Sequence, residues 1–221
     1  MSKYNIQTEA VIKAIKSAKD YEKVLRNNRY LLICRNNAKN IIECLEIRFP
    51  EYAYQHLTGL ELSQTTTLKS STDFYNACLQ NKLSEKDVVI EDTLMVEVKL
   101  SILPQLINFV HYSRMTVVFN GGRPYLKCDK VVGTTNFSMA IKKSETFYIP
   151  VSCLREDIRN FGDEVYQVIA VFSANYTDDV FSKIKNVAKG VNLRNINIPE
   201  KYKNVIDLSN YKEPDSKKGK E

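Results

Sequence analysis

The sequence has no tryptophan, and only two histidines, seven glycines and six prolines occur among its 221 residues. It also lacks an uninterrupted apolar run of membrane-spanning length, because charged residues recur through the N-terminal segment from Met1 to Lys23. A signal peptide and a transmembrane helix each need a continuous apolar stretch. We therefore expect neither, and no association with a membrane.

The cysteines are few, odd in number and scattered. They are Cys34, Cys44, Cys78, Cys128 and Cys153. No two are spaced as Cys-x-x-Cys, and no pair of histidines lies near them, so a zinc site or a disulfide framework is not expected. The pattern indicates buried thiols in a reducing cytoplasm, with no metal and no cofactor.

The net charge is +6 and is concentrated at the two ends of the chain. Residues 1–35 hold eight Lys or Arg against three Asp or Glu (+5), and residues 189–221 hold eight against five (+3), which leaves −2 for the middle. Basic flanks favour a polyanion such as RNA through release of counterions. Solvated lysines on a helix and on a tail explain the same charges equally well.

The apolar pattern predicts helices first and strands later. A 3.6-residue period over 6–25 predicts an amphipathic helix, and a second period from Thr93 to His111 predicts a long helix kinked at Pro104. Ser70 or Ser71 is expected to cap a helix over 74–80. Runs rich in β-branched and aromatic residues predict strands at 30–34, 41–49, 115–120, 125–132, 136–142, 146–151 and 164–173.

These elements define an α+β fold in which N-terminal helices and a hairpin pack with a C-terminal antiparallel β-sheet. We expect a single domain over residues 1–188, closed by a terminal helix at Thr177–Ala188. Residues 189–221 are polar and basic, and we expect them to form a largely disordered tail.

One of the two histidines occupies a position with a clear local prediction. Pro50 suits the first position of a helix and Gly59 the left-handed residue just after its end, which places His56 in the last turn. Tyr52 lies four residues earlier, on the same helix face. This setting suits acid–base chemistry, and it equally suits an ordinary helix end.

The motifs of several enzyme classes are missing. The chain has no P-loop, no Gly-x-Gly-x-x-Gly, no His-Glu-x-x-His, no Gly-x-Ser-x-Gly and no cluster of carboxylates suited to a magnesium-dependent nuclease. The remaining inventory suits metal-independent cleavage of RNA by its own 2′-hydroxyl. That reaction needs a base, an acid and groups that stabilise charge on phosphorus.

His56 is the candidate for proton transfer, and Thr58 could hydrogen-bond a non-bridging phosphate oxygen. The candidate cations are Arg123, Lys127 and Lys142, and Ser138 and Tyr125 could add donors. Each has a plain structural alternative: a helix end for His56, a solvent face for Ser138 and turn geometry for Arg123. His111 is expected to end the long helix.

Several segments resemble one known family. They include Phe49, His56-Leu57-Thr58-Gly59-Leu60, Phe74-Tyr75, Lys99-Leu100-Ser101-Ile102-Leu103, Asp129–Gly133 and Asn136-Phe137-Ser138. Over residues 10–175 the sequence is similar to the fourth family of phage-encoded nuclease-like domains with the barnase–EndoU–colicin–RelE (BECR) fold. The His-Leu-Thr-Gly element is the most specific part of the resemblance.

The resemblance implies helices packed on an antiparallel sheet whose exposed face holds the active site. It also implies a metal-independent ribonuclease encoded by a phage or mobile element and acting in a bacterial cytoplasm. His56 and Thr58 match the family's most recognisable motif, and Ser138 matches a later strand position. The alternative is a non-catalytic module that binds RNA or a host protein, and a third option is a toxin held in check by an antitoxin protein.

Overall fold

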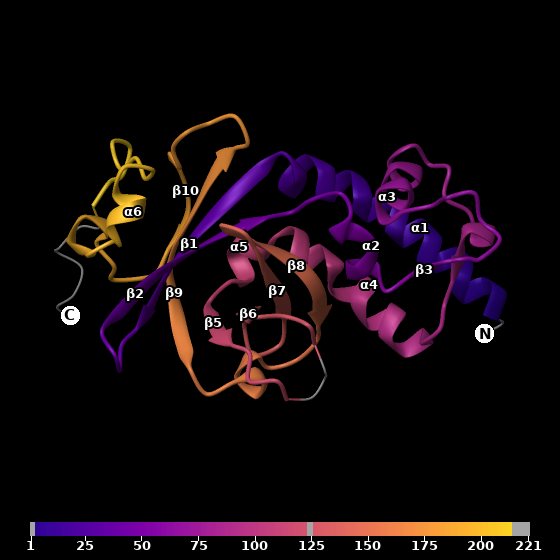
Figure 1. Ribbon diagram of the computed structural model, residues 1–221, viewed down its shortest axis with the longest axis horizontal. Coiled ribbons are helices and arrows are strands. Elements are labelled where there is room, and N and C mark those ends of the chain that lie inside the picture. Colours follow the sequence, from indigo (N-terminus) through magenta and orange to yellow (C-terminus); the bar gives the residue numbers. More distant parts are fainter. Residues whose placement is uncertain (1–2, 123–125, 214–221) are drawn as a thin grey trace, which may run out of the picture.

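Most of the helical residues gather at one end of the protein, beside a large β-sheet, as the computed structural model shows for residues 3–122 and 126–213 (Figure 1). The α-helices are α1 (Lys3–Tyr21), α2 (Ala53–Thr58), α3 (Ser71–Leu79), α4 (Thr93–Ile107), α5 (Phe109–Tyr112) and α6 (Glu200–Lys203). Shorter helical turns are Glu22–Arg26, Glu85–Asp87, Ile158–Phe161 and Leu193–Asn195. None of the described helices has both the length and the apolar character that crossing a bilayer requires.

Short connections join many of the consecutive strands. They are β1 (Asn28–Asn36), β2 (Ile41–Arg48), β3 (Glu61–Leu62), β4 (Val88–Val89), β5 (Met115–Val118), β6 (Lys130–Gly133), β7 (Ser138–Ser144), β8 (Phe147–Leu154), β9 (Val165–Asn175) and β10 (Lys183–Val187). The predicted hairpin is confirmed, since β1 and β2 pair antiparallel from Arg29↔Arg48 to Asn36↔Ile41.

The main sheet has the order β1-β2-β8-β7-β6-β5-β9-β10, and β1 also pairs with β9, so the sheet closes into a barrel-like form. The α+β class is confirmed, but the arrangement differs from the prediction. The N-terminal hairpin is part of the same sheet as the later strands, and β2 meets β8 in parallel at Ile47↔Tyr148.

The main core lies between the helices and one face of this sheet. Tyr21, at the end of α1, is fully buried and makes edge-to-face contacts with Phe49, Tyr54 and Tyr75 at centroid distances of 6.1, 5.0 and 5.6 Å. Aromatic pairs of this geometry contribute about 0.5–1.5 kcal/mol beyond the area they bury. Tyr21 therefore joins α1 to the segment that carries α2.

Two helix predictions need correction. The long helix ends at Ile107 and restarts as α5 after Asn108, with Pro104 inside α4. The terminal helix predicted for Thr177–Ala188 is wrong, because Lys183–Val187 forms strand β10 on β9. Lys183 and Lys185 are exposed, while Ile184 between them packs against a second cluster of buried residues that includes Leu31 and Phe172. This segment therefore has the two-residue alternation of a strand.

Residues 189–213, expected to be disordered from their composition, pack instead on the second face of the sheet. Leu193 and Ile198 are buried there against Leu31, Ile33 and Phe172. The hydroxyl of Tyr202 donates to the carbonyl of Cys44 at 3.2 Å. In Figure 1 this segment lies on the opposite side of β1 and β9 from helices α1 to α4.

Packing of this segment predicts a stability effect that a disordered tail would not give. Leu193→Ala should lower the free energy of unfolding by about 2–4 kcal/mol, because the side chain is 1% exposed and its removal leaves a cavity. Asn195→Ala, at an exposed position two residues later, should change it by less than about 0.5 kcal/mol. Urea unfolding of both variants measures the difference, and equal stabilities would contradict the packed arrangement.

Candidate functional site

The short helix α2 begins in a turn that the rest of the protein holds in place. The helix starts at Ala53 rather than at Pro50, whose carbonyl accepts from the Ala53 amide at 3.1 Å. The same carbonyl accepts from the Tyr21 hydroxyl at 2.9 Å. The predicted helix is thus confirmed, with Pro50 placed in the turn before it.

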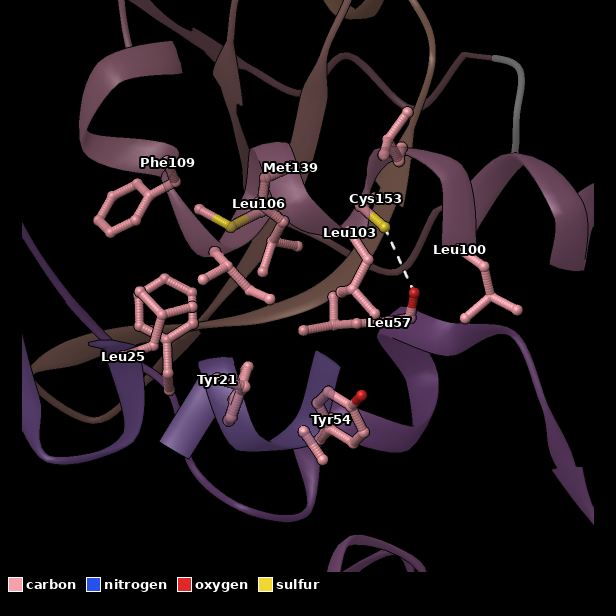
Figure 2. Packing of buried hydrophobic residues seen from close by; sticks show 14 of the residues in the cluster. Tyr21, Leu25, Tyr54, Leu57, Leu100, Leu103, Leu106, Phe109, Met139 and Cys153 are labelled. Carbon is pink, nitrogen blue, oxygen red and sulfur yellow. Dashed lines mark hydrogen bonds between the residues drawn. The ribbon is translucent and has the colours of Figure 1, made fainter. Parts of the chain in front are cut away.

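One side of α2 is built into the main core. Tyr54 and Leu57 are fully buried, and the Tyr54 hydroxyl donates to the carbonyl of Ala14 at 2.6 Å. Figure 2 shows both side chains in the apolar cluster, with the Cys153 thiol directed at the carbonyl of Leu57, 3.4 Å away. Burial raises the pKa of Cys153 to about 12, so this thiol stays protonated and acts as a donor.

The C-terminal end of α2 is closed by three groups. Gly59 has φ +76°, the left-handed conformation expected for it. The ammonium of Lys99, from α4, donates to the carbonyl of His56 at 2.8 Å. Lys99 is 9% exposed, and burial lowers its pKa. The Thr58 hydroxyl donates to the Gln55 carbonyl at 2.7 Å and accepts from the Leu60 amide at 3.1 Å.

The opposite side of α2 faces solvent. Within residues 52–60 only Tyr52 and His56 are exposed, and a separation of four residues aligns them on one helix face. No hydrogen bond or ion pair engages the His56 imidazole among the residues that the structure describes. An exposed imidazole on a fixed backbone is available for proton transfer to a bound molecule.

Beside the N-terminal end of α2 lies a group of three arginines and two glutamates, which we call the arginine cluster: Arg26, Arg29, Arg48, Glu46 and Glu51. Arg26 pairs with Glu51 at 2.8 Å. Glu46 lies 2.7 Å from Arg48 and 3.8 Å from Arg29. Arg29 and Arg48 face each other across the β1–β2 pair, so their side chains share one face of the sheet.

Tyr176 connects the arginine cluster to the exposed face of α2. Its ring lies 5.8 Å from the Arg26 guanidinium and 5.7 Å from that of Arg48. Burial raises the pKa of Tyr176, the two guanidiniums oppose the rise, and Tyr52 adds to it. Tyr52 therefore lies within electrostatic range of the Tyr176 ring. Tyr52 also shares a helix face with His56.

A family model described as phage-Barnase-EndoU-ColicinE5/D-RelE like nuclease4 matches residues 14–189. The chain belongs to this family. No curated protein and no solved structure matches the chain. The match confirms the resemblance drawn from the His-Leu-Thr-Gly element, and it includes α2 and the whole arginine cluster. Residues 190–213, which cover the second face of the sheet, lie outside the matched range.

In this nuclease-like protein the predicted site residues do not converge. Thr58 is fully buried, and its hydroxyl serves its own turn. Ser138 is also fully buried and donates to the carbonyl of Glu156 at 2.8 Å. Lys142 is exposed and lies four residues along β7 from Ser138, about 13 Å away.

The remaining candidates lie on other elements or outside the described residues. Lys127 is exposed in the loop before β6, and His111 is exposed at the end of the helical region, in α5. Arg123 and Tyr125 lie outside the described residues. Among the predicted site residues that the structure describes, His56 is therefore the one that shares the exposed face of α2 with Tyr52.

Sequence reasoning missed Lys99 and the arginine cluster. A signal for Lys99 was present, since it begins the Lys-Leu-Ser-Ile-Leu segment that resembles the family. For the arginines the signal was weaker, because Arg26, Arg29 and Arg48 come from three separate elements. Arg29 and Arg48 meet through the β1–β2 register, and Arg26 is connected to Arg48 through the ring of Tyr176. Among the described residues, no three His, Cys, Asp or Glu side chains form a group that could hold a metal ion.

The two hydrogen bonds of Thr58 predict that its hydroxyl stabilises the fold. Thr58→Val should lower the free energy of unfolding by about 1–3 kcal/mol, because it leaves buried backbone groups without partners. Thr58→Ser should restore most of the loss, and His56→Ala should change it by less than about 0.5 kcal/mol. Urea unfolding tests all three, and a fully stable Thr58→Val variant would contradict this role.

Proposed function

We propose that the protein is a metal-independent endoribonuclease that cleaves RNA by attack of the 2′-hydroxyl, with His56 as a proton-transfer group. One observation carries the proposal: the exposed, unengaged imidazole of His56 shares a helix face with Tyr52, which lies within electrostatic range of Tyr176, and the Tyr176 ring contacts Arg26 and Arg48. Membership of a nuclease-like family supports nuclease activity. RNA as the substrate follows from the chemistry of these side chains.

We assign to the arginines of the cluster the phosphate-stabilising role that was predicted for Arg123, Lys127 and Lys142. Arg26 and Arg48 are partly exposed, at 29% and 28% of their side chains, so their unused N–H groups can reach a phosphate. A guanidinium donates two parallel hydrogen bonds to phosphate oxygens and stabilises the charge that develops during cleavage. Tyr52 and Tyr176, both exposed, offer rings on which bases can stack.

Cleavage by the 2′-hydroxyl needs two proton transfers. His56 can supply one, and we assign the other to Glu51, whose carboxylate is 34% exposed and precedes Tyr52 directly. Two hydrogen bonds from Arg26 fix the position of the Glu51 carboxylate. Thr58 acts in this scheme by supporting the turn that follows His56, and Ser138 has a structural role at the start of β7.

Cleavage of a single-stranded RNA in the presence of EDTA tests the proposal. Wild type should produce fragments that end in a 2′,3′-cyclic phosphate, and a substrate with 2′-deoxyribose throughout should stay intact. His56→Ala should lower the rate by about 10²-fold or more, the contribution typical of acid–base catalysis. His111→Ala removes the other histidine, which is also exposed, and should leave the rate within about twofold of wild type.

Equal cleavage by wild type and His56→Ala would contradict the role of His56. Cleavage that EDTA abolishes would contradict metal independence. Binding of RNA without cleavage by any form would instead support the alternative, a non-catalytic RNA-binding module.

A further inference from the structure

A cavity of about 380 Å³ opens beside the arginine cluster, on the second face of the sheet. Its walls come from the β1–β2 pair, the β7–β8 turn and the C-terminal segment, and its volume lies in the range of roughly 300–1,000 Å³ typical of small-molecule sites. We call it the second-face cavity. Its charged lining residues are Arg29, Lys143, Lys201, Glu46 and Glu145.

The cavity is lined by three cationic side chains and two carboxylates, so positive charge is in excess. Glu46 is already engaged, with its carboxylate 2.7 Å from Arg48. No carboxylate lies within ion-pair distance of Lys143 or Lys201 among the residues that the structure describes. The Lys201 ammonium lies over the Tyr202 ring at 4.7 Å, where it remains able to bind an anion.

Arg29 also brings to this cavity an N–H group that has no hydrogen-bond acceptor among the described residues. One terminal nitrogen donates to the carbonyl of Asp178, and the guanidinium stacks on Phe181 at 4.6 Å. Its Nε atom is buried and makes no hydrogen bond. A buried N–H group that lacks a partner is costly, and an oxygen of a bound anion could satisfy it.

We propose that the second-face cavity binds a phosphate-bearing nucleotide of the same RNA strand that contacts the arginine cluster. This inference rests on the proposed function. The cavity continues the arginine cluster, because Arg29 faces Arg48 across β1 and β2 and Glu46 contacts both. Lys143 and Lys201 hold the phosphate, and Tyr202 lies beside it.

Part of this subsite comes from outside the matched family range. Lys201 and Tyr202 belong to α6, beyond residue 189, where the family match ends. The segment is fixed on the sheet by its own packing and by the bond from Tyr202 to Cys44. The C-terminal segment thus supplies substrate contacts that the matched part of the chain does not contain.

The test measures binding of a fluorescent ten-nucleotide single-stranded RNA to the full chain carrying His56→Ala, which removes cleavage from the readout. Lys143→Gln with Lys201→Gln should weaken binding by about tenfold and reduce the slope of log Kd against log salt by roughly 0.7, the value for one phosphate contact. The matched control, Lys185→Gln with Lys203→Gln, removes the same charge from exposed sites outside the cavity and should change neither quantity. Lys143→Arg with Lys201→Arg should restore affinity.

Equal weakening by both double variants, or by neither, would overturn the subsite. Competition adds a second arm, with adenosine 3′-monophosphate, adenosine and inorganic phosphate as probes. The monophosphate should compete best, and equal competition by inorganic phosphate would overturn recognition of a nucleotide. Binding that depends on Lys143 and Lys201 in a wild-type protein that cleaves no RNA would overturn the ribonuclease proposal and leave the subsite standing.

Discussion

The position of His56 depends on how the protein holds a helix of only six residues. Helices shorter than about 12 residues are marginal in water, so α2 exists because other elements fix it. Tyr54 and Leu57 bury one side, and Lys99 donates to the last turn from α4. These constraints leave one face of the helix to solvent, and that face presents Tyr52 and His56.

The closed sheet contributes the second half of the candidate site. Antiparallel pairing of β1 and β2 brings Arg29 opposite Arg48, and Glu46 holds both guanidiniums. The aromatic contacts of Tyr21 fix the turn between β2 and α2. Arg48, at the end of β2, and His56, in α2, therefore lie at the two ends of one short segment that the core holds in place, and positioning of this kind is what the proposed catalysis requires.

Several helix and strand boundaries that depend on local sequence patterns were predicted correctly. The alternation of 41–49 identified β2, the Ser70 cap identified the start of α3, and Gly59 marked the end of α2 correctly. Local patterns carried less information about tertiary placement. Leu94 falls within the apolar period that predicted the long helix but is 71% exposed, while Lys99 of the same helix is buried.

The remaining failures have the same physical origin. Arg29 and Arg48 meet only when the hairpin forms, and Arg26 is connected to Arg48 through Tyr176, so no spacing in the sequence identifies the three as a group. Residues 189–213 looked too polar to fold, yet apolar side chains such as Leu193 and Ile198 are enough to cover the second face of a sheet that already exists. Strand β10 similarly depends on the edge that β9 offers.

The central claim is that His56 and the arginine cluster form one RNA-binding surface. NMR of the His56 ring and of the Arg26 and Arg48 guanidiniums, during titration with a 2′-deoxy oligonucleotide that cannot be cleaved, tests it directly. The account predicts that all three side chains shift with one common midpoint, and that His111 does not respond. Shifts of the arginines with an unchanged His56 ring, or the reverse, would contradict it.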